Sequence, residues 1–181
     1  MKKLILILMA TFLVAGMTST VMAQNTVITP SPVGAKIVSV LTLINQNGLN
    51  FGTISKPVGN AKVTVATDGN RTVDVAGAGS VKLMTADATV AASYYKLTGE
   101  AGYVYSITLP GQTDVTITSG LNSITVTDFT VKSINEAGLA NKKGRLVGGN
   151  DEFKVGATLN LSNATVAGTY TGSFNVSVTY D

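Results

Sequence analysis

The stretch that decides the fold is the end of the chain, Gly168-Thr-Tyr-Thr-Gly-Ser-Phe-Asn-Val-Ser-Val-Thr-Tyr180-Asp181. Its large apolar side chains share one parity, with Gly172 as the only gap, and the other parity is polar throughout; the apolar set is Tyr170, Phe174, Val176, Val178 and Tyr180. Because successive side chains of a strand point to opposite faces, the pattern predicts a β-strand with one apolar face. Burying four such side chains contributes about 6–10 kcal/mol as an upper bound. The rest of the chain must therefore provide a groove for this strand.

A second segment alternates in the same way just before it. Phe153, Val155, Ala157, Leu159 and Leu161 share one parity, and the residues between them are polar or glycine. We expect this strand to pair with the C-terminal strand across the loop 163–168.

Shorter apolar runs separated by turn residues continue through the chain. They predict strands at 35–44, 49–54, 62–67, 71–75, 81–84, 93–98, 103–109, 115–118, 122–133 and 145–147. No period of three to four apolar residues persists after residue 24. About ten short strands at this spacing predict an all-β fold, an antiparallel β-sandwich rather than a helical or α/β domain.

Four local features refine this prediction. The segment 35–44 carries apolar residues on both parities, so either both of its faces are covered or part of it meets another chain. Asp68-Gly69-Asn70 predicts a hairpin turn, and Pro110-Gly111 predicts a turn that pairs the flanking strands. The parity slips between Val126 and Phe129, which predicts a β-bulge near 127–128.

The start of the chain has the pattern of a secretory signal peptide. A basic Met1-Lys2-Lys3 precedes the apolar run 4–14, and small residues end at Ala23. The apolar run is about half of the roughly 20 residues that a membrane helix needs. We therefore expect residues 1–23 to be removed, a flexible lead-in over 24–34, and a β-sandwich domain over 35–181. The product would be exported to the periplasm, the cell surface or the medium, with no membrane span.

The composition excludes several kinds of function. The chain contains no histidine and no cysteine, which removes the usual general base, thiol nucleophiles, common zinc ligands and disulfides. Loss of Lys2 and Lys3 from the 13 basic residues leaves a net charge near +1 against 10 acidic residues, which does not indicate a nucleic-acid partner. We expect no enzyme activity, no cofactor and no metal site.

Three weaker candidates each have a structural alternative. Asp151-Glu152 could bind calcium, but its spacing matches no known calcium loop. Lys142-Lys143-Gly144-Arg145 could contact a polyanion or simply be a solvated hairpin tip. The tyrosines could form a sugar-stacking platform or belong to the core: Tyr94, Tyr95, Tyr103 and Tyr105.

Three blocks in order resemble an uncharacterised family of secreted domains of Gram-negative bacteria. The blocks are Leu49-Asn-Phe-Gly-Thr-Ile54, the Gly-Tyr-x-Tyr-Ser-Ile-Thr-Leu-Pro pattern at 102–110, and Ala-Gly-Thr-Tyr-x-Gly-x-Phe-x-Val-x-Val-x-Tyr at 167–180. The last block also resembles the end of chaperone–usher pilus subunits and of spore-coat-protein-U-like domains. Those subunits have a glycine fourteenth from the end and a penultimate tyrosine, places that Gly168 and Tyr180 occupy here.

This resemblance implies an immunoglobulin-like, pilin-like sandwich that lacks one strand. In such subunits a periplasmic chaperone fills the resulting groove, and the N-terminal segment of the next subunit then replaces it at the usher. Residues 24–44 would be that donor here. The C-terminal strand would serve assembly through Gly168, Tyr170, Phe174, Val176, Val178 and Tyr180. The chain departs from many pilins because it has no disulfide.

Two functions are therefore expected from the sequence. The first is a non-enzymatic, exported structural or adhesive surface subunit, pilus-like and assembled by donor-strand complementation with like subunits. The second is a self-complete secreted binding module for glycan or protein.

Overall fold

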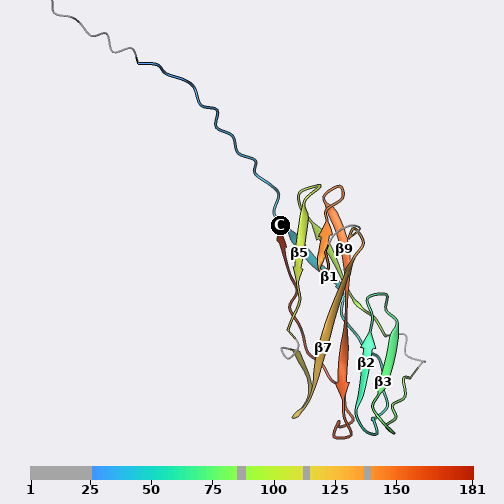
Figure 1. Cartoon of the computed structure of the whole chain (residues 1–181). Helices are drawn as coiled ribbons and strands as arrows, with labels where there is room; N and C mark the ends of the chain where they lie inside the picture. Colours follow the sequence, from blue (N-terminus) through green and yellow to red (C-terminus); the bar gives the residue numbers. More distant parts are fainter. Residues whose placement is uncertain (1–25, 85–88, 112–114, 137–139) are drawn as a thin grey trace, which may run out of the picture. The chain divides into compact units, whose positions relative to one another are not determined.

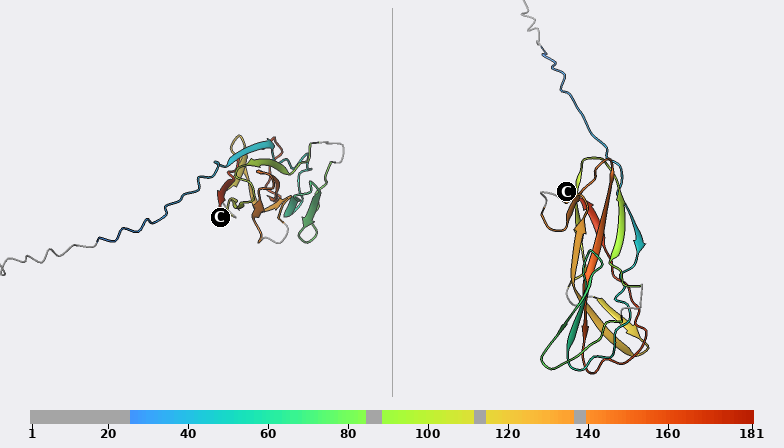
Figure 2. Two further views of the ribbon diagram at one scale, coloured as in Figure 1. Left: turned by 90° about the horizontal axis from the view of Figure 1, so that it is seen from above. Right: turned by 90° about the vertical axis from the view of Figure 1, so that its right-hand side faces the viewer.

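The computed structural model describes residues 26–84, 89–111, 115–136 and 140–181. The predicted signal peptide lies outside the described residues, as do the first two residues of the lead-in. A compact unit spans Ile37–Asp181. The described residues before it, 26–36, are exposed and extended and belong to no strand (Figure 1, Figure 2).

The described residues form no helix and ten strands, and every pairing between strands is antiparallel. The strands are β1 (Thr42–Asn47), β2 (Ala61–Val65), β3 (Arg71–Val75), β4 (Ser93–Thr98), β5 (Val104–Thr108), β6 (Val115–Ser119), β7 (Asn122–Ser133), β8 (Lys143–Arg145), β9 (Asn150–Leu161) and β10 (Ser177–Tyr180). They form two sheets, which confirms the predicted all-β antiparallel class and is consistent with a β-sandwich.

Strand β9 is the centre of the larger sheet. Along one edge it pairs first with β4, through Asn150–Val155, and then with β2, through Ala157–Leu161. Strand β7 runs along its other edge, while β1, β3 and β6 lie outside β4, β2 and β7 (Figure 1). The long alternating run predicted from Phe153 to Leu161 is thus the strand that holds this sheet together.

The smaller sheet has the order β10-β5-β8, and it corrects two predicted pairings. The C-terminal strand β10 pairs with β5 and not with β9. Strands β5 and β6 do not form a hairpin, because β5 belongs to the smaller sheet and β6 pairs with β7. Turn residues show where a strand ends, but they do not show whether the chain stays in the same sheet.

Four predicted strands are missing or much shorter than expected. Residues 35–41 belong to no strand, so β1 begins only at Thr42. The segments 49–54 and 81–84 are joined only by isolated bridges such as Ile54 to Leu83. The C-terminal run from Gly168 is a regular strand only over β10, with one earlier bridge from Thr171 to Thr118.

Other local predictions are confirmed. Strands β2 and β3 form the hairpin around Asp68-Gly69-Asn70. The register of β7 against β9 shifts between Thr127 and Thr130, and Asp128 has a φ of 52°. The brief strand expected at 145–147 is present as β8, two residues earlier, at the edge of the smaller sheet.

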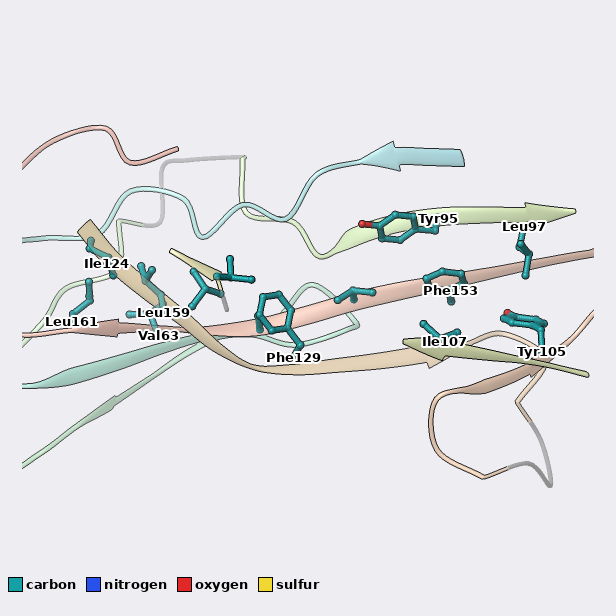
Figure 3. Close-up of a cluster of buried hydrophobic side chains, with 14 of the residues drawn as sticks. Val63, Tyr95, Leu97, Tyr105, Ile107, Ile124, Phe129, Phe153, Leu159 and Leu161 are labelled. Carbon is teal, nitrogen blue, oxygen red and sulfur yellow. The ribbon is translucent and has the colours of Figure 1, made fainter. Parts of the chain in front are cut away.

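The core lies between the two sheets. Figure 3 shows side chains from β4, β5, β7 and β9 directed toward one another, with Tyr95 stacked on Phe153 at a ring separation of 5.0 Å. The inward side chains of β9 are almost fully buried, as their alternation predicted: Phe153, Val155, Ala157, Leu159 and Leu161. Burial of apolar side chains such as these is the main favourable contribution to stability.

Candidate functional site: an open apolar groove

A groove of about 840 Å³ with a hydrophobic floor runs along one side of the compact unit. Its two walls are irregular segments of about ten residues each, 48–57 and 165–174. Its floor consists of hydrophobic side chains from the larger sheet: Tyr95, Val115, Ile117, Ile124, Val126, Leu159 and Leu161. Of these floor side chains Ile117 is partly exposed and the other six are buried, so the groove lies over the edge of the core, between two chain segments that are not regular strands.

The first wall is held by backbone hydrogen bonds within and just after it. Asn50 exchanges backbone hydrogen bonds with Ala91 at 2.9 and 3.0 Å, and Val58 exchanges them with Ser80 at 2.8 Å in both directions. These bonds are antiparallel bridges to the segment 80–91. These bonds join one edge of the wall to the rest of the domain.

Arg71 reinforces the same wall from strand β3. Its Nη1 donates to the carbonyl oxygens of Phe51 at 2.6 Å and Thr53 at 3.2 Å, and its Nη2 donates to that of Met84 at 2.8 Å. Gly52 has a φ of +68°, and a Cβ there would lie 2.7 Å from the same Nη1. The guanidinium group passes against the backbone at Gly52 and ties the wall to the β2–β3 hairpin.

The second wall is the first part of the C-terminal stretch. Thr171 exchanges backbone hydrogen bonds with Thr118 of β6 at 2.8 and 3.0 Å. A Cβ on Gly172 would lie 2.8 Å from Cγ2 of Ile117 and 3.0 Å from the carbonyl oxygen of Thr116. The gap in the apolar parity at Gly172 therefore permits the close approach of this wall to β6.

The predicted assembly residues divide between two places. Gly168, Tyr170 and Phe174 line the groove, whereas Val178 and Tyr180 belong to β10. The apolar parity packs against the core and the polar parity is exposed, as predicted, but the apolar side chains are only partly buried. Phe174 contacts Phe129 with ring centroids 5.0 Å apart, and the groove runs along the rest of this face.

Outside the groove, large hydrophobic side chains are exposed on the segment before β1, the N-terminal arm (residues 26–38). Val33 is 97% exposed and Ile37 is 94% exposed. Val27, Val33, Ala35 and Ile37 share one parity, whereas Ile28, Pro30 and Pro32 lie on the other. The arm therefore has a weakly alternating apolar side.

The four tyrosines do not form a shared platform. Tyr95 and Tyr105 are buried in the core, and Tyr94 is on the opposite face of β4 from Tyr95. Tyr103 packs edge-on against Tyr180 with ring centroids 5.6 Å apart. Neighbouring residues of one strand face opposite sides, so these rings cannot all meet one ligand.

The charged candidates make contacts within the domain. Lys143 Nζ lies 2.6 Å from Oδ2 of Asp181, and this ammonium group, with the Ser106 hydroxyl, lowers the pKa of the Asp181 carboxyl. Asp151 is buried and accepts hydrogen bonds from the side chains of Tyr105, Ser133 and Asn135. Its oxygens are directed to neighbouring side chains rather than to solvent.

Sequence reasoning missed part of this site. The sequence pattern predicts a strand at 49–54, where the structure has an irregular segment, and it assigns no role to Arg71. The glycine in Asn50-Phe-Gly-Thr is a signal in the sequence against a regular strand, because glycine often marks an interruption of a strand. In the structure Gly52 has a positive φ. No local signal identifies Arg71, because its acceptors lie 13 to 20 residues away in sequence.

Among the described residues, no three acidic, histidine or cysteine side chains gather into a group that could bind a metal ion. The same residues contain no helix of the length and hydropathy needed to cross a membrane.

Comparison with known proteins identifies a family but no named relative. Residues 41–180 match the model of the domain of unknown function DUF4402, so the chain belongs to this family. No curated protein matches the chain. No solved structure matches it either.

Proposed function

We propose that this member of an uncharacterised domain family is a non-enzymatic, exported structural or adhesive surface subunit. The arm of one copy would fill the groove of another as an added β-strand, in the manner of pilus subunits with an immunoglobulin-like fold. The observation that carries this proposal is that one chain contains both an open groove with a hydrophobic floor and an arm with exposed apolar side chains.

The dimensions of the two surfaces agree. Each wall of the groove contains about ten residues, and the arm contains 13 described residues. An extended chain rises about 3.3 Å per residue, so the arm is long enough to run along both walls. Its main chain would add a strand between 48–57 and 165–174, and Val33, Ala35 and Ile37 would face the apolar floor.

Other partners follow from the same groove. An open apolar surface beside irregular edges favours aggregation, so a periplasmic chaperone would cover it before assembly. An usher would then guide the exchange for the arm of a like subunit.

The proposal can be tested by mixing two complementary variants of the mature chain from residue 24. Val33→Asp with Ile37→Asp puts charges on the arm and leaves the groove intact. Ile117→Arg, at a partly exposed position of the groove floor, blocks the groove and leaves the arm intact. A charge buried without a partner costs several kcal/mol, so each variant alone should be monomeric. A mixture should form heterodimers and no longer species, measured by size-exclusion chromatography with light scattering.

The unsubstituted chain should form a ladder of oligomers in the same experiment. Leu121→Asp is the matched control, because Leu121 is fully exposed in the β6–β7 turn and does not line the groove. It should assemble like the unsubstituted chain. Circular dichroism should show a β spectrum for all variants. A monomeric unsubstituted chain, or a mixture without heterodimers, would contradict the proposal.

A separate hollow supports the second candidate, a binding module for glycan or protein. It has a volume of about 500 Å³ and lies beside Tyr94, with Asp68, Glu152 and Lys154 around it. An aromatic ring with convergent polar groups suits a sugar. Tyr94→Ala should abolish binding on a glycan array if this candidate is right, whereas no binding by the unsubstituted chain would exclude it as a glycan module.

A further inference from the structure

The outer face of the larger sheet carries a row of side chains that crosses four strands. Asn47 of β1 is paired with Tyr94 of β4. On its other side Tyr94 is paired with Lys154 of β9, which is paired in turn with Lys132 of β7. Tyr94, Lys154 and Lys132 each lie between buried or partly buried residues, so their side chains point away from the core. We call these residues the outer row (Asn47, Tyr94, Lys154 and Lys132).

The hollow of about 500 Å³ lies over this row, and every member of the row except Lys132 lines it. Along β9, Glu152 precedes Lys154 on the outer face and Gly156 follows it. Glu152 also lines the hollow, whereas a Cβ on Gly156 would lie 3.1 Å from the backbone nitrogen of Thr67. The turn of the β2–β3 hairpin therefore crosses the sheet just beyond Lys154 and closes one side of the hollow.

The hollow and the groove lie on opposite faces of the larger sheet. Tyr94 lines the hollow, whereas its neighbour Tyr95 belongs to the floor of the groove. These two side chains point to opposite faces of β4. A strand added in the groove would therefore leave the hollow open to solvent.

Both carboxylates at the hollow have partners of their own. Oε1 of Glu152 lies 3.7 Å from Nζ of Lys96, and the hydrogen bond of the Tyr94 hydroxyl with Glu152 raises the pKa of Tyr94. The Asp68 carboxylate accepts hydrogen bonds from the backbone N–H of Asn70 at 2.8 Å and from its side-chain amide at 2.6 Å. These bonds hold the pKa of Asp68 below its ordinary value.

The two lysines of the outer row lack such partners. Lys132 and Lys154 are exposed and lie directly opposite each other on neighbouring strands, where like charges destabilise a sheet. No ion pair among the described residues includes either lysine. Lys132 acts on Asp68 only as the smallest of the influences that lower the pKa of that carboxyl. An anion held between the two ammonium groups would relieve their repulsion.

The outer row offers three kinds of contact in one line. Two ammonium groups can bind one carboxylate or sulfate, and the Tyr94 ring can pack against the apolar face of a sugar. The side-chain amide of Asn47 can donate to and accept from hydroxyl groups. Strands lie about 4.8 Å apart, so the row spans about 14 Å, enough for an oligosaccharide of a few units. Asp68 and Glu152 beside the row disfavour a polymer with closely spaced phosphates.

We propose that the outer row binds an oligosaccharide that contains an acidic sugar. The carboxylate or sulfate of this sugar lies between Lys132 and Lys154, and a neighbouring sugar ring packs against Tyr94. This inference rests on the second candidate of the proposed function, a glycan-binding module, and names the class of its ligand. It is compatible with the first candidate, because the groove lies on the other face of the sheet.

Two matched pairs of probes test the charge of the ligand by isothermal titration calorimetry on the mature chain from residue 24. Trigalacturonate is compared with its methyl ester, and a sulfated galactose trimer with its desulfated form. At least one acidic probe should bind about tenfold more tightly than its neutral partner, the effect of one charge-assisted hydrogen bond. The preferred probe identifies the anionic group as carboxylate or sulfate. Added salt should weaken the acidic probe and leave the neutral one unchanged.

Paired lysine variants locate the site. Lys132→Gln with Lys154→Gln should remove the preference for the acidic probe. Lys62→Gln with Lys82→Gln is the matched control, because it changes the net charge equally at two exposed lysines that do not line the hollow. This control should bind like the parent.

Two single variants separate loss of a contact from damage to the domain. Lys132→Glu should abolish binding of the acidic probe and raise the thermal midpoint, because it places opposite charges across β7 and β9. Tyr94→Ala should weaken the acidic and the neutral probe by the same factor, because the ring packs against either sugar.

The outcomes distinguish this inference from the glycan candidate on which it rests. Equal affinities within both probe pairs, lowered alike by Tyr94→Ala, would overturn the acidic ligand and leave the glycan candidate intact. A preference that survives the loss of Lys132 and Lys154 would overturn the assigned site. A DNA oligonucleotide bound as tightly as the acidic probe would show attraction of charge without recognition of a sugar and would also overturn it. No binding of any probe would overturn the inference, and a glycan array without any hit would overturn the candidate as well.

Discussion

At the scale of residues, the stability of this domain depends on a few buried groups with matched partners. The Asp151 carboxylate accepts hydrogen bonds from Tyr105 at 2.9 Å and from Asn135 at 2.8 Å, and the Ser133 hydroxyl donates to it at 2.5 Å. Among the described residues, no buried side-chain nitrogen or oxygen lacks a partner. This network joins β5 of the smaller sheet to β7 and β9 of the larger one, in a chain without disulfides.

Tyr105 should make the stability depend on alkaline pH. Burial raises the pKa of Tyr105 above its ordinary value of about 10, and the Asp151 carboxylate adds to the increase. The unfolded tyrosine ionises near pH 10 while the folded one keeps its proton, so stability is intact below about pH 10 and falls above it. Urea unfolding between pH 8 and 11.5 measures this slope. Tyr105→Phe should be less stable at pH 8, and its stability should change less steeply with pH than that of the parent.

Gly156 should tolerate no side chain. It lies in the middle of β9, where a Cβ would lie 2.9 Å from the carbonyl carbon of Ala66 and closer still to the carbonyl oxygen of Val65. Both neighbours are backbone and cannot rotate away, so Gly156→Ala should cost about 1–3 kcal/mol in the free energy of unfolding. Gly48→Ala, with open space around it, should cost less than about 0.5 kcal/mol. Equal urea midpoints for the two variants would show that β9 can adjust.

At the scale of elements, strand β7 shows how a β-bulge keeps hydrophobic residues of opposite parity on the same face. Its bulge at 127–130 lets Ile124 and Val126 share the buried side with Phe129, despite their opposite parity. Asp128 takes up the extra residue with a φ of 52°, a conformation that asparagine, aspartate and glycine adopt most readily. Phe129 then reaches Phe174 beside the groove.

The bulge should be sensitive to the residue at 128. Asp128→Val puts a β-branched side chain at positive φ and should cost about 1–2 kcal/mol in unfolding free energy. Asp128→Gly should be close to neutral, because glycine adopts this φ without steric cost. Thr125→Val, on an exposed regular position of the same strand, is the control for β7. Equal losses for Val and Gly at 128 would indicate that the Asp128 carboxylate, and not its backbone, matters.

At the scale of the whole molecule, the compact unit has a core that is covered unevenly. Val63, Leu97, Phe153 and Val155 are completely buried between the sheets, whereas Ile117 lies open to the groove. Arg71 holds one wall of that groove, and the pairing with Thr118 holds the other. The unit is thus cohesive on its own and would gain further stability from one additional strand.

An arm peptide should therefore stabilise the domain. A synthetic peptide of residues 24–40, added to the Val33→Asp and Ile37→Asp variant, should raise the unfolding free energy by about 2.7 kcal/mol at 100 times its dissociation constant. The same peptide should not stabilise Ile117→Arg. A peptide with Asp at 33 and 37 serves as the control ligand. Thermal shift and calorimetry measure the effect, and equal shifts with both peptides would contradict strand addition.

Much of the local structure could be predicted from the sequence, because it depends on near neighbours. The one-sided burial of residues 170–180 follows from their alternation, the β2–β3 hairpin from Asp68-Gly69-Asn70, and the bulge from the parity slip near 127–128. The match of 41–180 to one family agrees with the blocks that carried the resemblance.

The tertiary structure alone decided which strands pair and where the groove opens. Alternation places a side chain on a face but does not identify the strand across the sheet, because that choice depends on burial summed over the whole fold. Strand β10 therefore pairs with β5 rather than with β9, and residues 49–54 become a wall rather than a strand. Likewise, only folding brings Tyr94, Lys154 and Lys132 into one row, since each lies on a different strand.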